Sequence, residues 1–390
     1  MVSLRGTNQE FGRPYNRRIV LEAIRLHGPI ERADIARRVG LTVQTVANII
    51  RELEDLDLVT GSRAQPKGRG SPATSLSINP AGGYTIGVHV AQFKLEAARV
   101  DLAGSISATV ERNIDTAAPA GAFAAIGDMI AELSDAKDRR LLGVGLAMPG
   151  PFDVDSMSFV GPTTLEGWRG FPIEQRLAEV AAAPAFIEAD SAAAALGERL
   201  HGAGRSIRDF FYLYFGVGLG GCMVHDGEAV RGAFRNDGEI GHVPLVPDGE
   251  PCACGSRGCI ERYVSLESFY RRSPAVGRTG WIAEAAPVLR RAIATIENLF
   301  DPETIIVGGI AEDDLLTELV AAAEPLLNSV SNRKARSNPR VLRSANGHDA
   351  VLRGAAAVAL SGVLSPRFGI MFAESERPDR NPMFMGSRVA

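Results

Sequence analysis

The sequence predicts a mainly α-helical N-terminal head followed by a larger α/β body of two lobes. Three observations predict this arrangement. Short amphipathic segments with helical periodicity occur between residues 16 and 56, and strand-like and Ala-rich helical segments alternate from about residue 85. The charge also changes: residues 1–80 carry 12 Lys/Arg and 8 Asp/Glu, a net of +4, which leaves −8 for the rest of the chain. A basic head on an acidic body is typical of a polyanion-binding domain joined to a part with another task.

The composition excludes several classes of protein. Hydrophobic residues make up 45% of the chain and charged residues 23%, which excludes a mainly disordered, collagenous or coiled-coil protein. A length of 390 residues predicts two or three domains. No apolar run is long enough for a membrane span, and residues 1–20 lack the apolar segment of a signal peptide, so we expect a cytoplasmic location. Four cysteines are too few for a disulfide scaffold.

The head is expected to contain three helices. Apolar residues recur at helical spacing over 16–26 and 30–39, and glycines interrupt the chain after each run. Thr42 is a suitable N-cap for a third helix that ends near Leu56. Gln and Asn can pair bidentately with adenine, and Arg with guanine or phosphate. The candidate DNA-reading residues near the start of this helix are Thr42, Gln44, Thr45, Asn48 and Arg51.

Two short strands are expected after the helices, at 58–59 and 75–78. Between them lies a Gly-rich basic segment, in which Lys67 and Arg69 would contact the phosphate backbone or the minor groove. Helices, turn, hairpin and charge together predict a winged helix-turn-helix domain over residues 1–80, with double-stranded operator DNA as its partner. The alternative is a three-helix protein-interaction module with a solvated loop.

The body, residues 81–390, begins after the turn-rich segment 79–83. Strands are expected at 85–90, 96–100, 142–147, 185–187, 210–215 and 304–307, and helices at 120–133, 173–182 and 281–299. This alternation predicts an α/β fold, and its recurrence in two halves predicts two lobes with a cleft between them. We place the lobes at approximately 81–195 plus a C-terminal helix, and 196–352.

A cluster of metal-binding residue types is the most specific motif. His242 is followed after nine residues by Cys252, Cys254 and Cys259. Three thiolates and one imidazole form a tetrahedral zinc set, and four protein ligands leave no open coordination position, so the zinc would be structural. The alternative is three inert or redox-active cysteines. Cys222 lies apart in an apolar context and is expected in the core.

The chain resembles the ROK family, which is named for repressors, open reading frames and kinases. The resemblance rests on the E-x-G-H motif at 239–242 and the C-x-C-G-x-x-G-C-x-E motif at 252–261. Supporting matches lie at 148–153, 167–168, 190 with 196–198, 216–221, 301–303 and 308–309. The resemblance implies an actin-like ATPase and sugar-kinase fold with a sugar bound between the lobes.

By this resemblance the residues that hold sugar hydroxyls would be Asp190, Glu239, His242 and Glu261. Taken singly, Asp190 could instead be a helix cap, and the two glutamates could be solvated loop charges. Ala189 and Thr164 stand where sugar-binding members usually carry Asn, so the ligand is expected to be a sugar or sugar derivative other than plain glucose.

The residues that serve phosphate in the kinases of the family are missing. Those kinases carry D-x-G-G-T in the first body strand, where this chain has His89-Val90-Ala91-Gln92-Phe93, and Val217 replaces a Thr of the second phosphate hairpin. Side chains in place of the glycines block the approach of phosphate. We therefore expect a sugar-responsive regulator of the repressor type that is not an enzyme and acts as a homodimer or homotetramer. The alternatives are a sugar kinase and a DNA-binding regulator without a sugar ligand.

Overall fold

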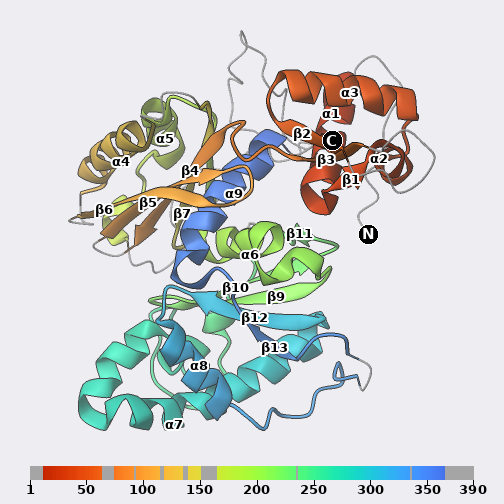
Figure 1. The fold of residues 1–390 in the computed structure, drawn as a ribbon. Coiled ribbons are helices and arrows are strands. Elements are labelled where there is room, and N and C mark those ends of the chain that lie inside the picture. The colour runs from red at the N-terminus through yellow and green to blue at the C-terminus, as the bar shows by residue number, and fades with distance from the viewer. Residues whose placement is uncertain are drawn as a thin grey trace.

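The computed structural model describes residues 12–63, 74–91, 94–114, 118–134, 139–150, 165–233, 236–333 and 336–364. Within these ranges one β-sheet forms in the head and one in each lobe of the body (Figure 1). The predicted combination of a helical head and a two-lobed α/β body is confirmed. None of the helices in these ranges is long and apolar enough to cross a membrane.

The head consists of three helices and a small antiparallel sheet. The helices are α1 (Gly12–His27), α2 (Arg32–Val39) and α3 (Val43–Asp55), and the strands β1 (Ile30–Glu31), β2 (Val59–Arg63) and β3 (Thr74–Ile78) pair in the order β1-β3-β2. Thr42 caps α3, since its Oγ1 accepts a hydrogen bond from the Thr45 backbone N at 3.1 Å. The helix expected from residue 30 starts only at Arg32, because residues 30 and 31 pair with β3. Lys67 and Arg69 lie outside the described residues.

One apolar core holds the head together and extends into the body. The buried face of α3, formed by Val46, Ile49, Ile50 and Leu53, packs in this core. Three body residues belong to the same core: Leu102, Leu142 and Leu360. The head is therefore docked on the body through buried apolar side chains, and a displacement of those body residues would disturb it.

The first lobe contains a five-stranded sheet in the order β6-β5-β4-β7-β8. Its strands are β4 (Tyr84–Ala91), β5 (Lys94–Asp101), β6 (Ile106–Asn113), β7 (Leu141–Met148) and β8 (Ala185–Ala189). Helices α4 (Pro119–Ser134) and α5 (Ile173–Ala181) pack on the face that carries Ile86 and Val88. Because side chains alternate along a strand, Thr85 and His89 face the opposite side, where Thr85 Oγ1 bonds the Ala356 carbonyl at 3.2 Å.

The second lobe repeats the plan with a sheet in the order β11-β10-β9-β12-β13. Its strands are β9 (Phe210–Phe215), β10 (Leu219–His225), β11 (Glu228–Ala229), β12 (Thr304–Gly309) and β13 (Val341–Arg343). Helices α7 (Leu266–Phe300) and α8 (Asp313–Ala322) cover its outer face. The helix expected at 281–299 is the second part of α7, after a break at Gly277, whose φ is 72°.

Two helices lie between the sheets: α9 (Ala350–Leu364) packs on the first sheet, and α6 (Asp190–His201) packs between α9 and the second sheet (Figure 1). Small residues allow the layers to approach closely. A Cβ on Gly354 of α9 would lie 2.3 Å from the Ala193 carbonyl O of α6, and one on Gly145 of β7 would lie 1.9 Å from the Ala355 O. Asp190, the first residue of α6, is thereby fixed between the two sheets.

Candidate ligand and metal site

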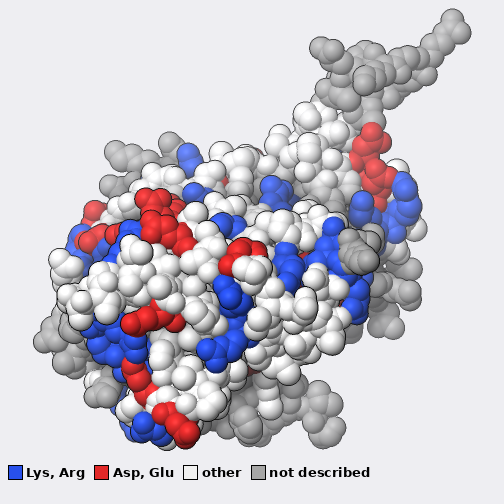
Figure 2. All heavy atoms as spheres, turned by 90° about the horizontal axis from the view of Figure 1, so that it is seen from below, with Lys and Arg blue, Asp and Glu red and all other residues white. Residues whose placement is uncertain are grey.

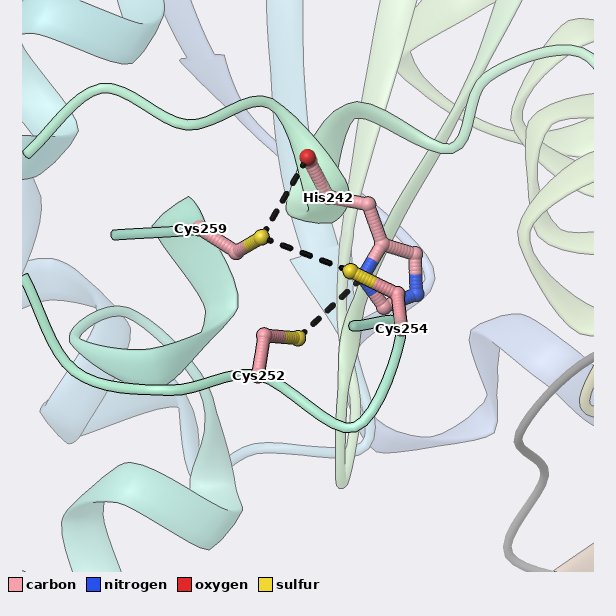
Figure 3. Close-up of side chains that lie close together, drawn as sticks. All are labelled: His242, Cys252, Cys254 and Cys259. Atoms are coloured by element: carbon pink, nitrogen blue, oxygen red, sulfur yellow. Dashed lines mark hydrogen bonds between the residues drawn. The ribbon is translucent and has the colours of Figure 1, made fainter. Parts of the chain in front are cut away.

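The four metal-ligating residues predicted from the sequence come together in the second lobe. Their side chains point toward one another from three short segments, and their ligand atoms all lie within 4.8 Å of one another (Figure 3). His242 ends the 3₁₀-helix η3 (Ile240–His242), and Cys259 directly precedes η4 (Ile260–Arg262). Cys252 and Cys254 lie on the loop between them. Pairing of Pro244 with Cys259 holds the two ends of the segment together.

The distances between the donor atoms fit a tetrahedral zinc ion. With zinc about 2.3 Å from sulfur and about 2.0–2.1 Å from nitrogen, tetrahedral angles place two sulfurs about 3.8 Å apart and a sulfur and a nitrogen about 3.6 Å apart. Cys254 Sγ lies 3.7 Å from Cys259 Sγ, and Cys252 Sγ lies 3.5 Å from His242 Nδ1. Nδ1 is therefore the imidazole nitrogen turned to the thiols. Cys222 is buried elsewhere in the core, as expected.

Glu239 and Glu261, two of the predicted carboxylates, lie at the two ring nitrogens of His242, and the third, Asp190, lies close enough to act on the charge of Glu239. His242 Nε2 lies 3.9 Å from Glu239 Oε2, and its Nδ1 lies 3.3 Å from Glu261 Oε1. Burial raises the pKa of Glu239, and the negative charges of Asp190 and Glu261 raise it further. The structure thus brings residues of α6, η3 and η4 to one place. Carboxylates that share a partly buried site can accept several hydrogen bonds from a polyol.

Asp190 has a partner that the sequence analysis missed. The hydroxyl of Tyr214, on β9, lies beside the Asp190 carboxylate and interacts with it electrostatically. Asp190 Oδ1 also accepts from the backbone N of Ser191 at 2.7 Å, so the carboxylate both begins α6 and faces the second sheet. Burial raises the pKa of Asp190, while nearby His89 opposes the rise. The contact with Tyr214 links the helix of one layer to the sheet of the other lobe.

A chain of close polar contacts occupies the position at which the family resemblance places the kinase phosphate motif. His89 of β4 is 2% exposed, and its Nδ1 lies 3.6 Å from Oε2 of Glu96, its cross-strand partner. Lys94 Nζ lies 2.8 Å from both Glu96 and Glu111. The close approach of His89, together with Lys94, lowers the pKa of Glu96 to about 2. The strand that carries the phosphate-binding Asp in kinases therefore uses its polar groups for internal contacts.

The glycine-rich segment 216–221 forms a hairpin between β9 and β10, as expected from the sequence. Gly216 N bonds the Gly218 carbonyl at 3.0 Å, and β10 continues from Leu219 antiparallel to β9. The Val217 carbonyl accepts from the Glu267 backbone N at 3.1 Å. The segment therefore does not begin a helix, and a helix N-terminus that could receive phosphate is absent from it.

The predicted DNA-reading residues of α3 lie on its outer face. Gln44, Asn48 and Arg51 are exposed, as is Thr42 at the cap, and Thr45 is half-buried. Asn48 Oδ1 accepts hydrogen bonds from Gln44 Nε2 at 3.3 Å and Arg51 at 2.7 Å. This network orients the polar side chains along one side of the helix. Such a surface matches the major-groove code of hydrogen-bond donors and acceptors.

The body presents a different kind of surface. Figure 2 shows one face of the molecule, on which groups of basic side chains and groups of acidic side chains lie near one another. In the second lobe, Arg262, Arg271 and Arg272 form ion pairs with Glu250 and Glu267. Paired charges of both signs give little net potential, so this group of residues is not expected to attract a polyanion.

The last residue of α6 lies at the junction of the head and the body. The His201 ring packs on the turn between β5 and β6, where a Cβ on Gly104 would lie 2.3 Å from His201 Nδ1. Burial, together with the positive charges of Arg25 in α1, Arg205 and Arg353, lowers the pKa of His201 to about 3. The turn also carries Leu102 of the head core. Helix α6 therefore runs from the carboxylate cluster to the junction.

Two family models match the chain. The ROK family model matches residues 85–284 and 277–361, and a model of the winged helix-turn-helix DNA-binding type matches residues 14–60. The DNA-binding transcriptional dual regulator NagC of Escherichia coli K12 is 26% identical over 394 residues, which cover 92% of this chain and 96% of that protein. The winged helix-turn-helix model matches the part of the chain in which the sequence predicts a DNA-binding domain.

Two solved structures show the fold. A ROK family transcriptional regulator described as a homologue of the E. coli MLC protein superposes with a TM-score of 0.70 at 22% identity, over 90% of this chain and 96% of that one. A ROK family glucokinase from Streptomyces griseus, solved with glucose and AMPPNP, superposes with a TM-score of 0.62 at 29% identity, over 72% of this chain and 100% of that one. The kinase matches the body, whereas the regulator matches nearly the whole chain.

Proposed function

Since the chain belongs to the ROK family, we propose that it is a sugar-responsive transcriptional regulator, a repressor in type, without kinase activity. One observation supports this proposal above the others. A single helix, α6, joins the carboxylate cluster to the junction on which the winged helix rests: Asp190 is its first residue and His201 its last. The chain thus combines a ligand-binding type of site, a DNA-binding type of head and a direct physical connection between them. We place this activity in the cytoplasm.

The ligand would be a small sugar or sugar derivative held by Asp190, Glu239, Glu261 and His242. A sugar hydroxyl that donates to Asp190 would compete with the hydroxyl of Tyr214 for the same carboxylate. Ala189 offers no amide for a further hydrogen bond, which supports a ligand with a hydroxyl pattern or substituent different from that of glucose. His242 Nε2 faces Glu239, away from the thiols, and is available to the ligand.

The four ligands His242, Cys252, Cys254 and Cys259 would hold a structural zinc ion. Zinc supplies a cross-link between the segments around η3 and η4, which carry Glu239 and Glu261. Two of the carboxylates that face the ligand are then fixed by the same ion that fixes His242. With Nδ1 on the metal, the imidazole keeps one orientation and presents Nε2 to the ligand.

The coupling would run along α6. A ligand that binds Asp190 better in one arrangement of the lobes shifts the population toward that arrangement. Because α6 is packed closely against α9, the two helices would move together. His201 would then transmit this displacement to the turn beside Leu102. A coupling free energy of about 1–3 kcal/mol, or about 5–150-fold in affinity, is sufficient. Two heads of a homodimer would then change their spacing on a two-fold-related operator.

The test measures DNA binding and the response to sugars in the same full-length protein. Operator duplexes are selected from a random pool, and the dissociation constant is measured with and without each member of a sugar panel. We expect one sugar class to change the affinity by about 5–150-fold. Asp190→Asn should abolish this response and leave operator binding unchanged, whereas Gln44→Ala should change sequence preference and Arg69→Glu should weaken binding to all duplexes.

Two results would contradict the proposal. Phosphoryl transfer from ATP to a sugar, lost in Asp190→Asn, would make the protein a kinase. Unchanged DNA affinity and thermal stability across a broad panel would favour a regulator without a sugar ligand, because a ligand at 100 times its dissociation constant should stabilise the protein by about 2.7 kcal/mol.

A further inference from the structure

An apolar side chain stands at the start of the DNA-reading helix. Val43 is the first residue of α3 and is 52% exposed. Among the residues of the head whose exposure the structure describes, it is the one large hydrophobic side chain in the exposed class. Burial of an isopropyl group is favourable by roughly 1.5–3 kcal/mol. The folded chain leaves this side chain in solvent, so a binding partner that buries it could gain this free energy.

The Val43 side chain lies outside the core because of its position in α3. The buried residues of α3 are Val46, Ile49, Ile50 and Leu53, and Val43 precedes the first of them by one turn. The helix begins there because Thr42 caps it, so no earlier turn covers the Val43 side chain. The first turn of a recognition helix is the part that reaches base edges in the major groove.

The polar side chains near Val43 on α3 form hydrogen bonds with one another. Gln44 bonds Asn48, and Asn48 is bonded by Arg51, which leaves this network on the adjoining side of the helix. Val43 can offer no hydrogen bond to a base. In the major groove the apolar group that a base edge presents is the C5-methyl of thymine, which alkyl side chains contact.

We infer that Val43 contacts the C5-methyl group of a thymine in each operator half-site and thereby selects thymine at that position. This inference rests on the proposed DNA-binding function. It adds an apolar specificity contact to the polar residues of α3. Since Gln pairs well with adenine, the thymine is expected beside an adenine read by Gln44 or on the strand opposite it.

Replacement of single atoms in the DNA tests this contact. Deoxyuridine differs from thymidine only by the missing methyl group, so each thymine of a selected operator half-site is replaced in turn. Dissociation constants are measured for the full-length wild-type protein and for Val43→Ala. For the wild type we expect one replacement to weaken binding by about 4-fold, which is the value of one buried methyl group. The same replacement should leave the affinity of Val43→Ala unchanged.

A second set of duplexes, in which a methyl group is added, and a control variant complete the experiment. In a duplex with cytosine at the contacted position, 5-methylcytosine should restore part of the affinity for the wild type and none for Val43→Ala. Val230→Ala, which removes an exposed valine of the body, should behave as the wild type. Unchanged thermal unfolding of Val43→Ala will show that the helix still forms, as expected for an exposed position.

The outcomes distinguish a failure of the Val43 contact from a failure of the proposed DNA-binding function. Tight, sequence-specific binding with equal deoxyuridine effects in wild type and Val43→Ala, or with no such effect at any thymine, would refute the Val43 contact alone. A change of oligomeric state in Val43→Ala without a methyl effect would assign Val43 to contacts between protein chains and would also refute it. Failure of the protein to bind any duplex would refute the proposed function together with this inference.

Discussion

Protonation of His201 should weaken the junction between head and body as the pH falls. Its pKa is lowered from 6.5 to about 3 by burial and by the positive charges of Arg25, Arg205 and Arg353. The unfolded chain therefore binds a proton more readily than the folded one. The contribution of neutral His201 is fully present above about pH 6.5 and is lost progressively as the pH falls toward 3.

The size of the effect follows from the difference between the two pKa values. Each pH unit between them changes the stability by about 1.36 kcal/mol, so from pH 7 to pH 5 the free energy of unfolding should fall by about 2 kcal/mol on account of this residue. His201→Gln places a neutral side chain at the same position and removes the titration. Other groups titrate in both proteins and cancel in the comparison.

The measurement is urea-induced unfolding of wild type and His201→Gln at pH 7 and pH 5, followed by circular dichroism. We expect the wild type to lose about 2 kcal/mol more than the variant over this interval. Limited proteolysis at the head should show the same difference, because the lost contacts lie beside α1. Parallel pH dependences in the two proteins would show that His201 is not buried at this junction.

Three further predictions concern stability and metal content. Glu297→Gln should lower the free energy of unfolding by about 3–5 kcal/mol, because the fully buried Glu297 pairs with Arg336 and Arg340, and Glu284→Gln at an exposed ion pair should have a small effect. Gly354→Ala should destabilise by about 1–3 kcal/mol in urea unfolding, since its Cβ would overlap the α6 backbone, whereas Gly121→Ala in the first turn of α4, with open space around it, should be neutral or stabilising. Cys259→Ser should reduce the zinc content measured by atomic emission well below one ion per chain, and Cys222→Ser should retain it; equal zinc content in the two variants would contradict the assigned ligands.

Local patterns in the sequence accounted for most of the elements. The end of α2 at Gly40 and the start of α3 after Thr42 were predicted because both depend on residues a few positions apart. The metal ligands were predicted for the same reason, as all four lie within 18 residues. Strand β6 was missed because it is an exposed edge strand whose polar and apolar residues give a weak pattern.

Contacts between distant segments could not be predicted in this way. The proximity of Tyr214 to Asp190 depends on how the second sheet lies against α6, and an aromatic residue in a buried strand is ordinarily a core residue. His201 gave no indication of its burial, since a single histidine at a helix end is common. The close packing of Gly197 on Gly354 likewise requires that two helices more than 150 residues apart meet. These tertiary contacts are the ones that join the candidate site to the head.

The pairing of His89 with Glu96 also bears on the evolutionary history of the chain. An aspartate restored at position 89 would face the Glu96 carboxylate on the neighbouring strand, and two like charges directly opposite each other destabilise a sheet. An aspartate at this position would thus require compensating substitutions on β5 before it could be tolerated on β4. Under the proposed function, this pair would hinder a return to phosphoryl transfer by single mutations.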